Sequence, residues 1–328
     1  MQEVSVCHQA GIAAGFTLFG WTMNRKLLTI LLGIIIVLFV LFPDMISRGA
    51  KTGLLLWFDT VLPALLPFMI VSNFMIKQNI TKSVSRVVYP LFSRLFGLSR
   101  GGCYPAVIGL LSGYPLGAKT TAQLYQEQMI SREEAQYLLT FCNNASPMFL
   151  MEYMGIHCMG LHYPAVLAGI IYLSALSGTL FFRKKRFQEG CCSLKPYAYQ
   201  KQSVIASLDE SILDAFVTIT KVGGYIMLFS ILAQVMAELM PFPAMVKYIG
   251  IGILEITTGG AVLAESAVPG AVRNSILAGL CAFGGLSSVA QTASVLGETD
   301  LSVKRYFLAK LLQMIFAAAF AAFWFHLN

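Results

Sequence analysis

Long apolar blocks, separated by short charged segments, run along almost the whole chain. They cover residues 27–42, 54–76, 137–155, 163–182, 215–240 and 305–326. Of all residues, 57% are hydrophobic and only 12% are charged, and the mean hydropathy is +0.71, a balance that is foreign to soluble domains. A helix of about 20 apolar residues crosses a bilayer and leaves no backbone group unpaired in lipid. The chain is therefore predicted to be an all-α polytopic membrane protein.

Lysine and arginine are concentrated in alternate loops, which predicts an orientation. When Arg25 and Lys26 are placed in the cytoplasm, the basic run at 183–186 and most of the 23 Lys and Arg residues fall on the same side, as the positive-inside rule requires. We therefore expect a multi-pass protein of the cell membrane with both termini in the cytoplasm. On this trace residues 101–127 are too few for two crossings, which need about 40 residues, and are predicted to form a re-entrant hairpin.

Two glycine-rich segments occupy matching positions in the two halves of the chain. Residues 109–121 read GLLSGYPLGAKTT and residues 279–293 read GLCAFGGLSSVAQTA. Each has an apolar arm, a tip rich in small residues and a second arm that begins with small polar residues. Paired interruptions of this kind indicate the binding site of a carrier with inverted repeats. We predict two inverted-topology repeats, each with spanning helices, a re-entrant helical hairpin and a broken helix; the alternative is chance similarity between helices rich in small residues.

The predicted divisions of the chain follow from this plan. A disordered N-terminal extension is expected at residues 1–22 and an anchor helix at 23–45. The first repeat covers 50–160, with its hairpin at 101–127. A linking helix and a cytoplasmic loop cover 161–208, and the second repeat covers 209–328, with its hairpin at 270–297. Hairpins that enter from opposite sides would bring their tips together near the middle of the bilayer.

Four interruptions of helical sequence are predicted at membrane depth, where unpaired backbone is tolerated only around a cavity or inside protein. Two are the hairpin tips. The third is Cys142-Asn143-Asn144-Ala145-Ser146-Pro147, and the fourth is Glu255-Ile256-Thr257-Thr258-Gly259-Gly260, where a helix is expected to stop at the glycine pair. The residues predicted to bind a solute or an ion are Gly113, Pro115, Gly117, Lys119, Thr120, Asn143, Asn144, Ser146, Glu255, Thr257, Gly284, Ser287, Ser288 and Gln291.

Each of these residues also has a purely structural interpretation. Asn143 and Asn144 would bind a hydroxyl-rich solute or Na⁺, or would instead join helices through hydrogen bonds. Glu255 suits a proton, because a carboxylate costs about 2.5–3.5 kcal/mol at the centre of a bilayer; alternatively it lies near the outer headgroups. Lys119 aligns with Gln291 across the repeats, and its side chain would contact the solute or extend to the cytoplasmic surface.

Other classes of function have little support in the sequence. Seven cysteines include no C-x-x-C pair, and the odd number argues against a disulfide framework. Four scattered histidines have no metal-ligand spacing, and neither a phosphate-binding loop nor a nucleophile elbow is present. We therefore predict no enzyme, no metal site and no cofactor. The net charge of +7 is better explained by membrane topology than by nucleic acid.

Four motifs resemble a known family. They are Gly113-Tyr114-Pro115-Leu116-Gly117-Ala118-Lys119, Ile130-Ser131-x-Glu133-Glu134-Ala135, Phe141-Cys142-Asn143-Asn144-x-x-Pro147 and Glu255-x-Thr257-x-Gly259. The chain is similar, over about residues 50–328, to the YlbJ-type sporulation integral membrane proteins. That family lies in the wider nucleoside recognition or gate-domain group, together with spore maturation proteins, the membrane part of ferrous iron transporters and concentrative nucleoside transporters.

The resemblance implies a role in endospore formation around cortex assembly, with hairpin tips and broken helices holding the ligand. We predict a transporter or gate for a small polar solute, nucleoside-like or a spore-envelope precursor, with Na⁺ or H⁺ as the coupling ion. Its expected partners are membrane lipid, further copies of itself or other sporulation membrane proteins. The alternative is a scaffold for the sporulation machinery that transports nothing. Ala145-Ser146 stands where the family pattern has Ser-Gly, which changes the fine geometry expected at that site.

Overall fold

The computed structural model describes residues 17–18, 21–22, 25–78, 80–182, 187, 203–297 and 299–327. Most of the predicted extension at 1–22 and most of the predicted cytoplasmic loop within 161–208 therefore lie outside the described residues. Near the N-terminal end of the described part, strand β1 (Thr17–Leu18) pairs antiparallel with strand β2 (Trp21–Thr22).

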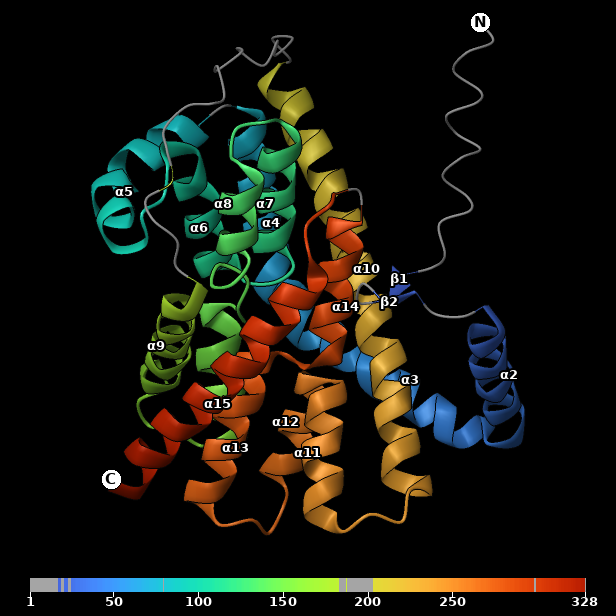
Figure 1. The fold of residues 1–328 in the computed structure, drawn as a ribbon. Coiled ribbons are helices and arrows are strands. Elements are labelled where there is room, and N and C mark those ends of the chain that lie inside the picture. Colours follow the sequence, from blue (N-terminus) through green and yellow to red (C-terminus); the bar gives the residue numbers. More distant parts are fainter. Residues whose placement is uncertain are drawn as a thin grey trace, which may run out of the picture.

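Helices form nearly all of the remaining structure, which confirms the all-α prediction (Figure 1). In chain order they are α2 (Arg25–Leu41), α3 (Pro43–Leu56), the π-helical η2 (Trp57–Val61), α4 (Leu62–Lys77), α5 (Thr81–Phe96), α6 (Arg100–Ser112), α7 (Leu116–Gln126), α8 (Arg132–Leu138), the π-helical η3 (Phe149–Cys158), α9 (Ala165–Phe182), α10 (Val204–Leu239), α11 (Ala244–Leu254), α12 (Ile256–Ala264), α13 (Gly270–Phe283), α14 (Gly285–Leu296) and α15 (Val303–Leu327).

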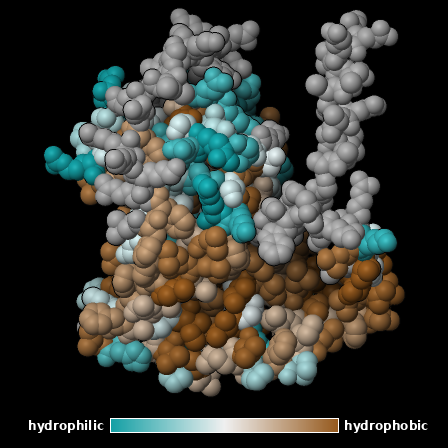
Figure 2. All heavy atoms as spheres, viewed as in Figure 1, coloured by the Kyte–Doolittle hydropathy of each residue, from teal (hydrophilic) through white to brown (hydrophobic). Residues whose placement is uncertain are grey.

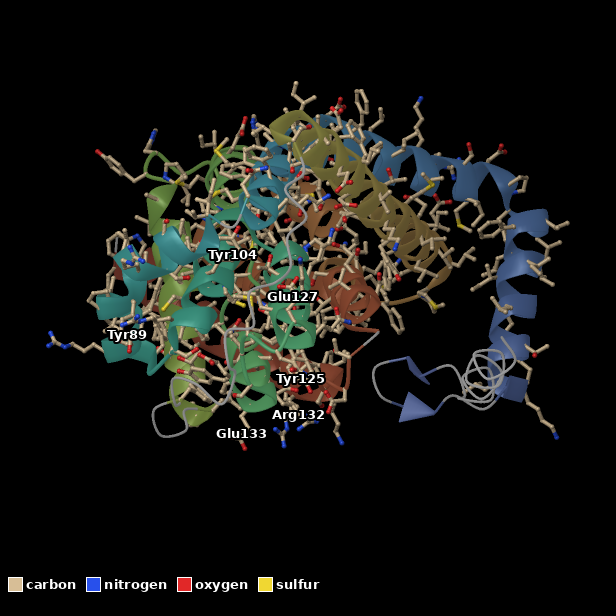
Figure 3. The ribbon with its side chains drawn as sticks, turned by 90° about the horizontal axis from the view of Figure 1, so that it is seen from above. Tyr89, Tyr104, Tyr125, Glu127, Arg132 and Glu133 are labelled. Atoms are coloured by element: carbon tan, nitrogen blue, oxygen red, sulfur yellow. The ribbon has the colours of Figure 1, made fainter. Side chains whose placement is uncertain are left out.

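Within the described residues, four helical segments are long and apolar enough to cross a membrane: Pro43–Lys77, Val204–Leu239, Gly270–Leu296 and Val303–Leu327. Shorter apolar helices occur at Leu32–Leu41, Ala165–Thr179 and Ala244–Leu254. Figure 2 shows a hydrophobic belt over the lower part of the molecule and a hydrophilic upper part, where α5 to α8 lie. Seen from above, Arg132 and Glu133 lie toward the rim of this hydrophilic end (Figure 3). The belt is the surface that we expect lipid to cover.

The first hairpin forms at the predicted place. Helix α6 ends at Gly113, whose φ of 75° is accessible to glycine at little cost, and α7 packs back against α6. The two arms come close because both present glycine: a Cβ on Gly117 would lie 2.9 Å from the Cα of Gly109. The glycines of this segment therefore form the turn and the packing surface of the hairpin.

The predicted hairpin at 270–297 is wrong. Helices α13 and α14 follow one another and together form a candidate span, Gly270–Leu296, interrupted at Gly284. Gly284 and Gly285 have φ values of 81° and 77°, and this short left-handed step interrupts the helix without reversing the chain (Figure 1). The hairpin of the second half is instead α11/α12, which turns at Glu255, and a Cβ on Gly259 would lie 2.3 Å from the Cα of Gly252.

Apart from α5, which has no counterpart in the second half, the same order of elements occurs in both halves of the chain. In the first half, α4 and α5 precede the α6/α7 hairpin, the interrupted helix α8–η3 and the helix α9. In the second half, α10 precedes the α11/α12 hairpin, the interrupted helix α13–α14 and the helix α15. Figure 1 shows the first hairpin in the upper part and the second in the lower part. This order is the one that an inverted repeat requires, although the symmetry itself stays a prediction.

Candidate functional site

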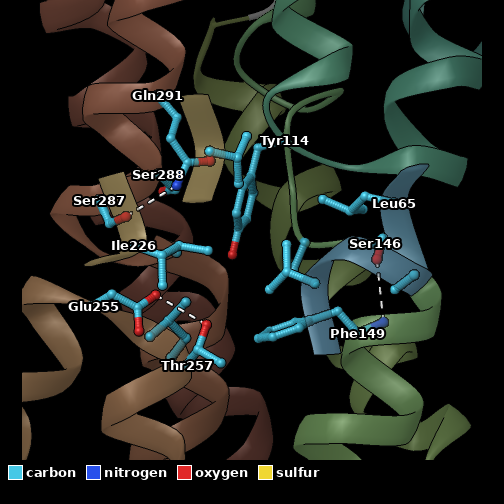
Figure 4. A pocket seen from close by; sticks show the side chains of 16 residues that line it. Leu65, Tyr114, Ser146, Phe149, Ile226, Glu255, Thr257, Ser287, Ser288 and Gln291 are labelled. Atoms are coloured by element: carbon cyan, nitrogen blue, oxygen red, sulfur yellow. Dashed lines mark hydrogen bonds between the residues drawn. The ribbon is translucent and has the colours of Figure 1, made fainter. Parts of the chain in front are cut away.

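The two hairpin turns and the two helix interruptions meet around one small cavity of about 30 Å³. The turn of the first hairpin contributes Tyr114 and that of the second contributes Glu255. The interruption of α8–η3 contributes Ser146, and that of α13–α14 contributes Gly284. The other lining residues are Val61, Ala64, Leu65, Ala145, Phe149, Val222, Ile226, Ile256, Thr257, Ser287, Ser288 and Gln291. We call this cavity the central pocket (Figure 4).

The turn of the first hairpin is fixed to the first helix interruption. The backbone N–H of Tyr114 donates to the carbonyl oxygen of Asn144 at 2.7 Å, and a Cβ on Gly113 would lie 2.6 Å from the backbone nitrogen of Ser146. Helix α8 ends at Leu138, and the chain becomes helical again only shortly before Phe149. The predicted unwinding at 142–147 is therefore confirmed, and its backbone groups are partly satisfied by the hairpin turn.

Glu255 is the turning point of the second hairpin and has an extended backbone, with φ −146° and ψ 117°. Its carboxylate accepts the N–H of Thr258 at 2.7 Å and the hydroxyl of Thr257 at 3.1 Å. It thus caps the N-terminus of α12, where the helix dipole favours negative charge. The side chain is 2% exposed. Helix α12 continues through Gly259 and Gly260, so the predicted stop at that glycine pair is wrong.

The second interruption supplies hydroxyl and amide groups. Ser288 donates to the carbonyl oxygen of Gly285 at 2.9 Å, and the amide nitrogen of Gln291 donates to the hydroxyl oxygen of Ser287 at 3.1 Å. The side-chain oxygen of Gln291 is buried and has no hydrogen-bond partner among the described residues. Because a buried acceptor without a partner costs about 1–3 kcal/mol, this oxygen is a group that a ligand or a water molecule would satisfy.

Tyr114 was missed by sequence reasoning. Its ring projects into the central pocket between Ser288 and Leu65, and its hydroxyl points toward the end of the pocket where Glu255 lies (Figure 4). The signal was present, because Tyr114 lies inside the glycine and proline motif of the first hairpin. Within that motif only Gly113, Pro115 and Gly117 were expected at the site, so the side chain of Tyr114 was not considered.

Asn143 and Asn144 do not line the central pocket, contrary to the prediction. The side-chain oxygen of Asn143 accepts the N–H of Ala118 at 3.1 Å, and its nitrogen donates to Thr292 at 2.8 Å and to Tyr306 at 3.1 Å. This is the arrangement expected from the alternative interpretation, in which the amides join helices. The asparagines hold the unwound segment against α7, α14 and α15.

A second, larger hollow of about 340 Å³ lies between α7, α10 and α14. Three predicted residues line it, namely Pro115, Lys119 and Gln291, and Gln291 also lines the central pocket. The ammonium of Lys119 donates to the hydroxyl of Thr218 at 2.8 Å. Of the remaining predicted residues, Gly117 packs against the carbonyl of Cys142, and the buried hydroxyl of Thr120 has no partner among the described residues.

The two cavities differ in what they hold. A volume of 30 Å³ accommodates about two water molecules or a partly hydrated ion. A volume of 340 Å³ lies within the range of about 300–1,000 Å³ for small-molecule sites. The structure therefore has an ion-sized pocket among the helix interruptions and a solute-sized hollow beside it, with Gln291 in both walls. Among the described residues there is no group of His, Cys, Asp and Glu side chains suited to a metal ion.

The chain is similar to known proteins over most of its length. The family model "Gate: Nucleoside recognition" matches residues 58–176. The "Sporulation integral membrane protein YlbJ" of Bacillus subtilis (strain 168) is 30% identical over 317 residues, which cover 85% of this chain and 77% of that protein. No solved structure matches the chain.

Proposed function

Because the chain belongs to the family of YlbJ sporulation integral membrane proteins, we propose that it is a transporter or gate for a small polar solute in endospore formation. The observation that carries this proposal is the meeting of two hairpin turns and two helix interruptions around one cavity. Non-helical backbone at membrane depth is tolerated where it borders a cavity or lies within protein. Discontinuous helices around a central site are the plan of alternating-access carriers.

In this proposal the solute first binds in the hollow. It then passes through the central pocket when the hairpins move. The hollow has the volume for a nucleoside-like molecule or a fragment of an envelope precursor, whereas the central pocket does not. Gln291 lines both cavities. Its unpaired amide oxygen is therefore the first group of the central pocket that a solute leaving the hollow would contact. The structure then corresponds to a state in which the central pocket is closed.

We propose that the hollow opens to the cytoplasm; the C-terminal end of α15 lies at the opposite end of the molecule from α8 (Figure 1), so the predicted cytoplasmic C-terminus does not fit this orientation. Lys119 and Lys221 line the hollow and Lys77 pairs with its lining residue Asp214, and the positive-inside rule puts such basic clusters in the cytoplasm. The coupling ion in this proposal is Na⁺ or H⁺. The central pocket is large enough for either, and its wall contains the carboxylate of Glu255.

A thermal-shift screen of the purified protein with nucleosides and cell-wall precursors tests the proposal. A solute that binds is expected to raise the melting temperature of the wild-type protein, and the Gln291→Ala variant is expected to bind it about tenfold more weakly, since one buried hydrogen bond is lost. Gln234→Ala is the matched control, because Gln234 bonds to Glu238 at an exposed end of α10, away from both cavities.

Uptake of the same solute into proteoliposomes separates transport from binding alone. Wild-type protein is expected to accumulate the solute, and Gln291→Ala is expected to do so at a reduced rate. If no solute of either class stabilises the protein, and if cells that carry the Gln291→Ala variant sporulate normally, the transport proposal fails. The scaffold alternative is then favoured.

A further inference from the structure

Lys310 is a buried lysine in the N-terminal half of the apolar helix α15, with an exposed fraction of 1%. Its ammonium donates to three oxygens: the side-chain oxygen of Asn144 at 2.7 Å, the carbonyl oxygen of Ala282 at 3.0 Å and the side-chain oxygen of Gln313 at 3.2 Å. Among the described residues no carboxylate lies within ion-pair distance of this ammonium. The partners of the Lys310 Nζ atom are therefore all neutral oxygens.

The three oxygens come from separate parts of the site. Asn144 belongs to the interruption of the first half, and Ala282 lies in the last turn of α13, immediately before the interruption of the second half. The carbonyl of Ala282 is one of the groups that a helix end leaves without an intrahelical partner. Gln313 lies one turn along α15, and its side-chain nitrogen bonds to the carbonyl of Thr140, in the non-helical segment that follows α8. Lys310 thus ties both interruptions to α15.

These three oxygens are the kind of ligands that a cation site has. Carbonyl and amide oxygens at unwound segments and at the C-terminal ends of half-helices coordinate Na⁺ in carriers with broken helices. An ammonium group offers three N–H donors and here meets three acceptors. A lysine that was only a structural anchor would be expected to pair with a carboxylate, because an isolated charge is costly to bury.

We propose that these oxygens form a monovalent-cation site whose occupant is the protein's own Lys310 ammonium. The tethered charge holds the two helix interruptions in register, as a bound Na⁺ would, and the wild-type protein therefore needs no Na⁺ at this position. One further step rests on the proposed function. Because Lys310 occupies the site that Na⁺ would fill, the proton is the remaining candidate for the coupling ion of transport.

Removal of the lysine side chain, followed by addition of Na⁺, tests the cation site. Lys310→Ala is expected to melt at a lower temperature than the wild type in choline chloride, because the oxygens then face each other without a cation. Replacing choline with Na⁺ at constant ionic strength is expected to restore much of the loss in a saturable manner, whereas the wild type and the control Lys304→Ala, an exposed lysine on the same helix, change little.

Two further variants make the test decisive. Lys310→Met fills the space of the side chain and removes the charge, so it is expected to show no recovery with Na⁺. In Lys310→Ala combined with Asn144→Ala, the recovery is expected to be lost. The proposal is overturned if Na⁺ stabilises Lys310→Ala no more than the wild type, if the wild type itself shows saturable stabilisation by Na⁺, or if Lys310→Ala cannot be purified even in Na⁺. The test contains no solute, so its result is independent of the transport proposal.

Discussion

At the residue scale, a few side chains connect elements that are distant in the sequence. Glu134 is an example: its two carboxylate oxygens accept the backbone N–H of Ser99 at 2.7 Å and the hydroxyl of Ser99 at 2.8 Å. Ser99 is the N-cap of α6, and the N–H of Glu134 itself donates to Ser131, the N-cap of α8. One buried carboxyl therefore fixes the base of the first hairpin to the start of the first interrupted helix.

The Glu134 carboxyl predicts how stability depends on pH. Burial raises the pKa of Glu134, and the two hydrogen bonds from Ser99 offset this only in part. A folded pKa above the unfolded value of about 4.3 contributes stability that is present at lower pH and is lost as pH rises through the folded pKa. In melting experiments from pH 4 to pH 8, Glu134→Gln is expected to gain stability relative to the wild type as pH rises. A difference that stays constant with pH would contradict this assignment.

At the element scale, both hairpins depend on glycines where their arms touch. In α11/α12, Gly252 and Gly259 bring the two backbones so close that a Cβ on Gly259 would lie 2.3 Å from the Cα of Gly252. In α6/α7, a Cβ on Gly117 would lie 2.9 Å from the Cα of Gly109. Since backbone atoms cannot move aside as side chains do, neither hairpin has room for a methyl group.

Gly259→Ala is therefore expected to lower the free energy of unfolding by about 1–3 kcal/mol, as overpacking does, or to prevent the α11/α12 hairpin from closing. Gly224→Ala is the matched control, because a Cβ on Gly224 meets no atom within 4 Å, and it is expected to leave stability equal or slightly higher. The two melting temperatures in the same detergent decide the matter. Equal values would show that the hairpin arms are not in close contact.

The first hairpin was predictable from sequence, and the second was not, for a physical reason. The basic residues around the first hairpin leave too little chain for two crossings, so the fold of that segment follows from length alone. The glycines at 284 and 285 indicate an interruption, but a left-handed step carries no information about whether the chain reverses. The reversal occurs at Glu255, where a carboxylate and two threonines form an N-cap that resembles ordinary helix chemistry.

The central pocket was predictable only in part. Ser146, Glu255, Thr257 and Ser287 were expected there because they lie at interruptions, and they line it. Asn143 and Asn144 were also expected there, but their partners Thr292, Tyr306 and Lys310 lie about 150 or more positions along the chain. A sequence without its fold gives no indication that these groups satisfy the amides first.

At the scale of the whole molecule, the two hairpins occupy opposite ends, and the hydrophobic belt lies toward one of them (Figures 1 and 2). The end with α5 to α8 is hydrophilic, whereas the other end has only a thin polar edge. If the hairpins enter the bilayer from opposite sides, the loops at their bases face different compartments. This is the arrangement that the inverted repeat requires.

Cysteine accessibility checks that arrangement. In a variant without native cysteines, Glu133→Cys, at the base of the first hairpin, is expected to react with a membrane-impermeant maleimide only from the cytoplasmic side. Ala267→Cys, in the loop between α12 and α13, is expected to react only from the outside. Both positions are exposed, so the two labels share the same chemistry. Labelling of both from one side would rule out inverted repeats.

The wall shared by the hollow and the central pocket has an electrical consequence. Water in the hollow would carry the potential of the compartment to which it opens, so the voltage across the membrane would fall mainly over the protein beyond Gln291. A charge that moves past this side chain would then sense most of the field over a short path, at about 2.3 kcal/mol per elementary charge for each 100 mV. Movement of a proton or a charged solute at this point would therefore be strongly voltage-sensitive.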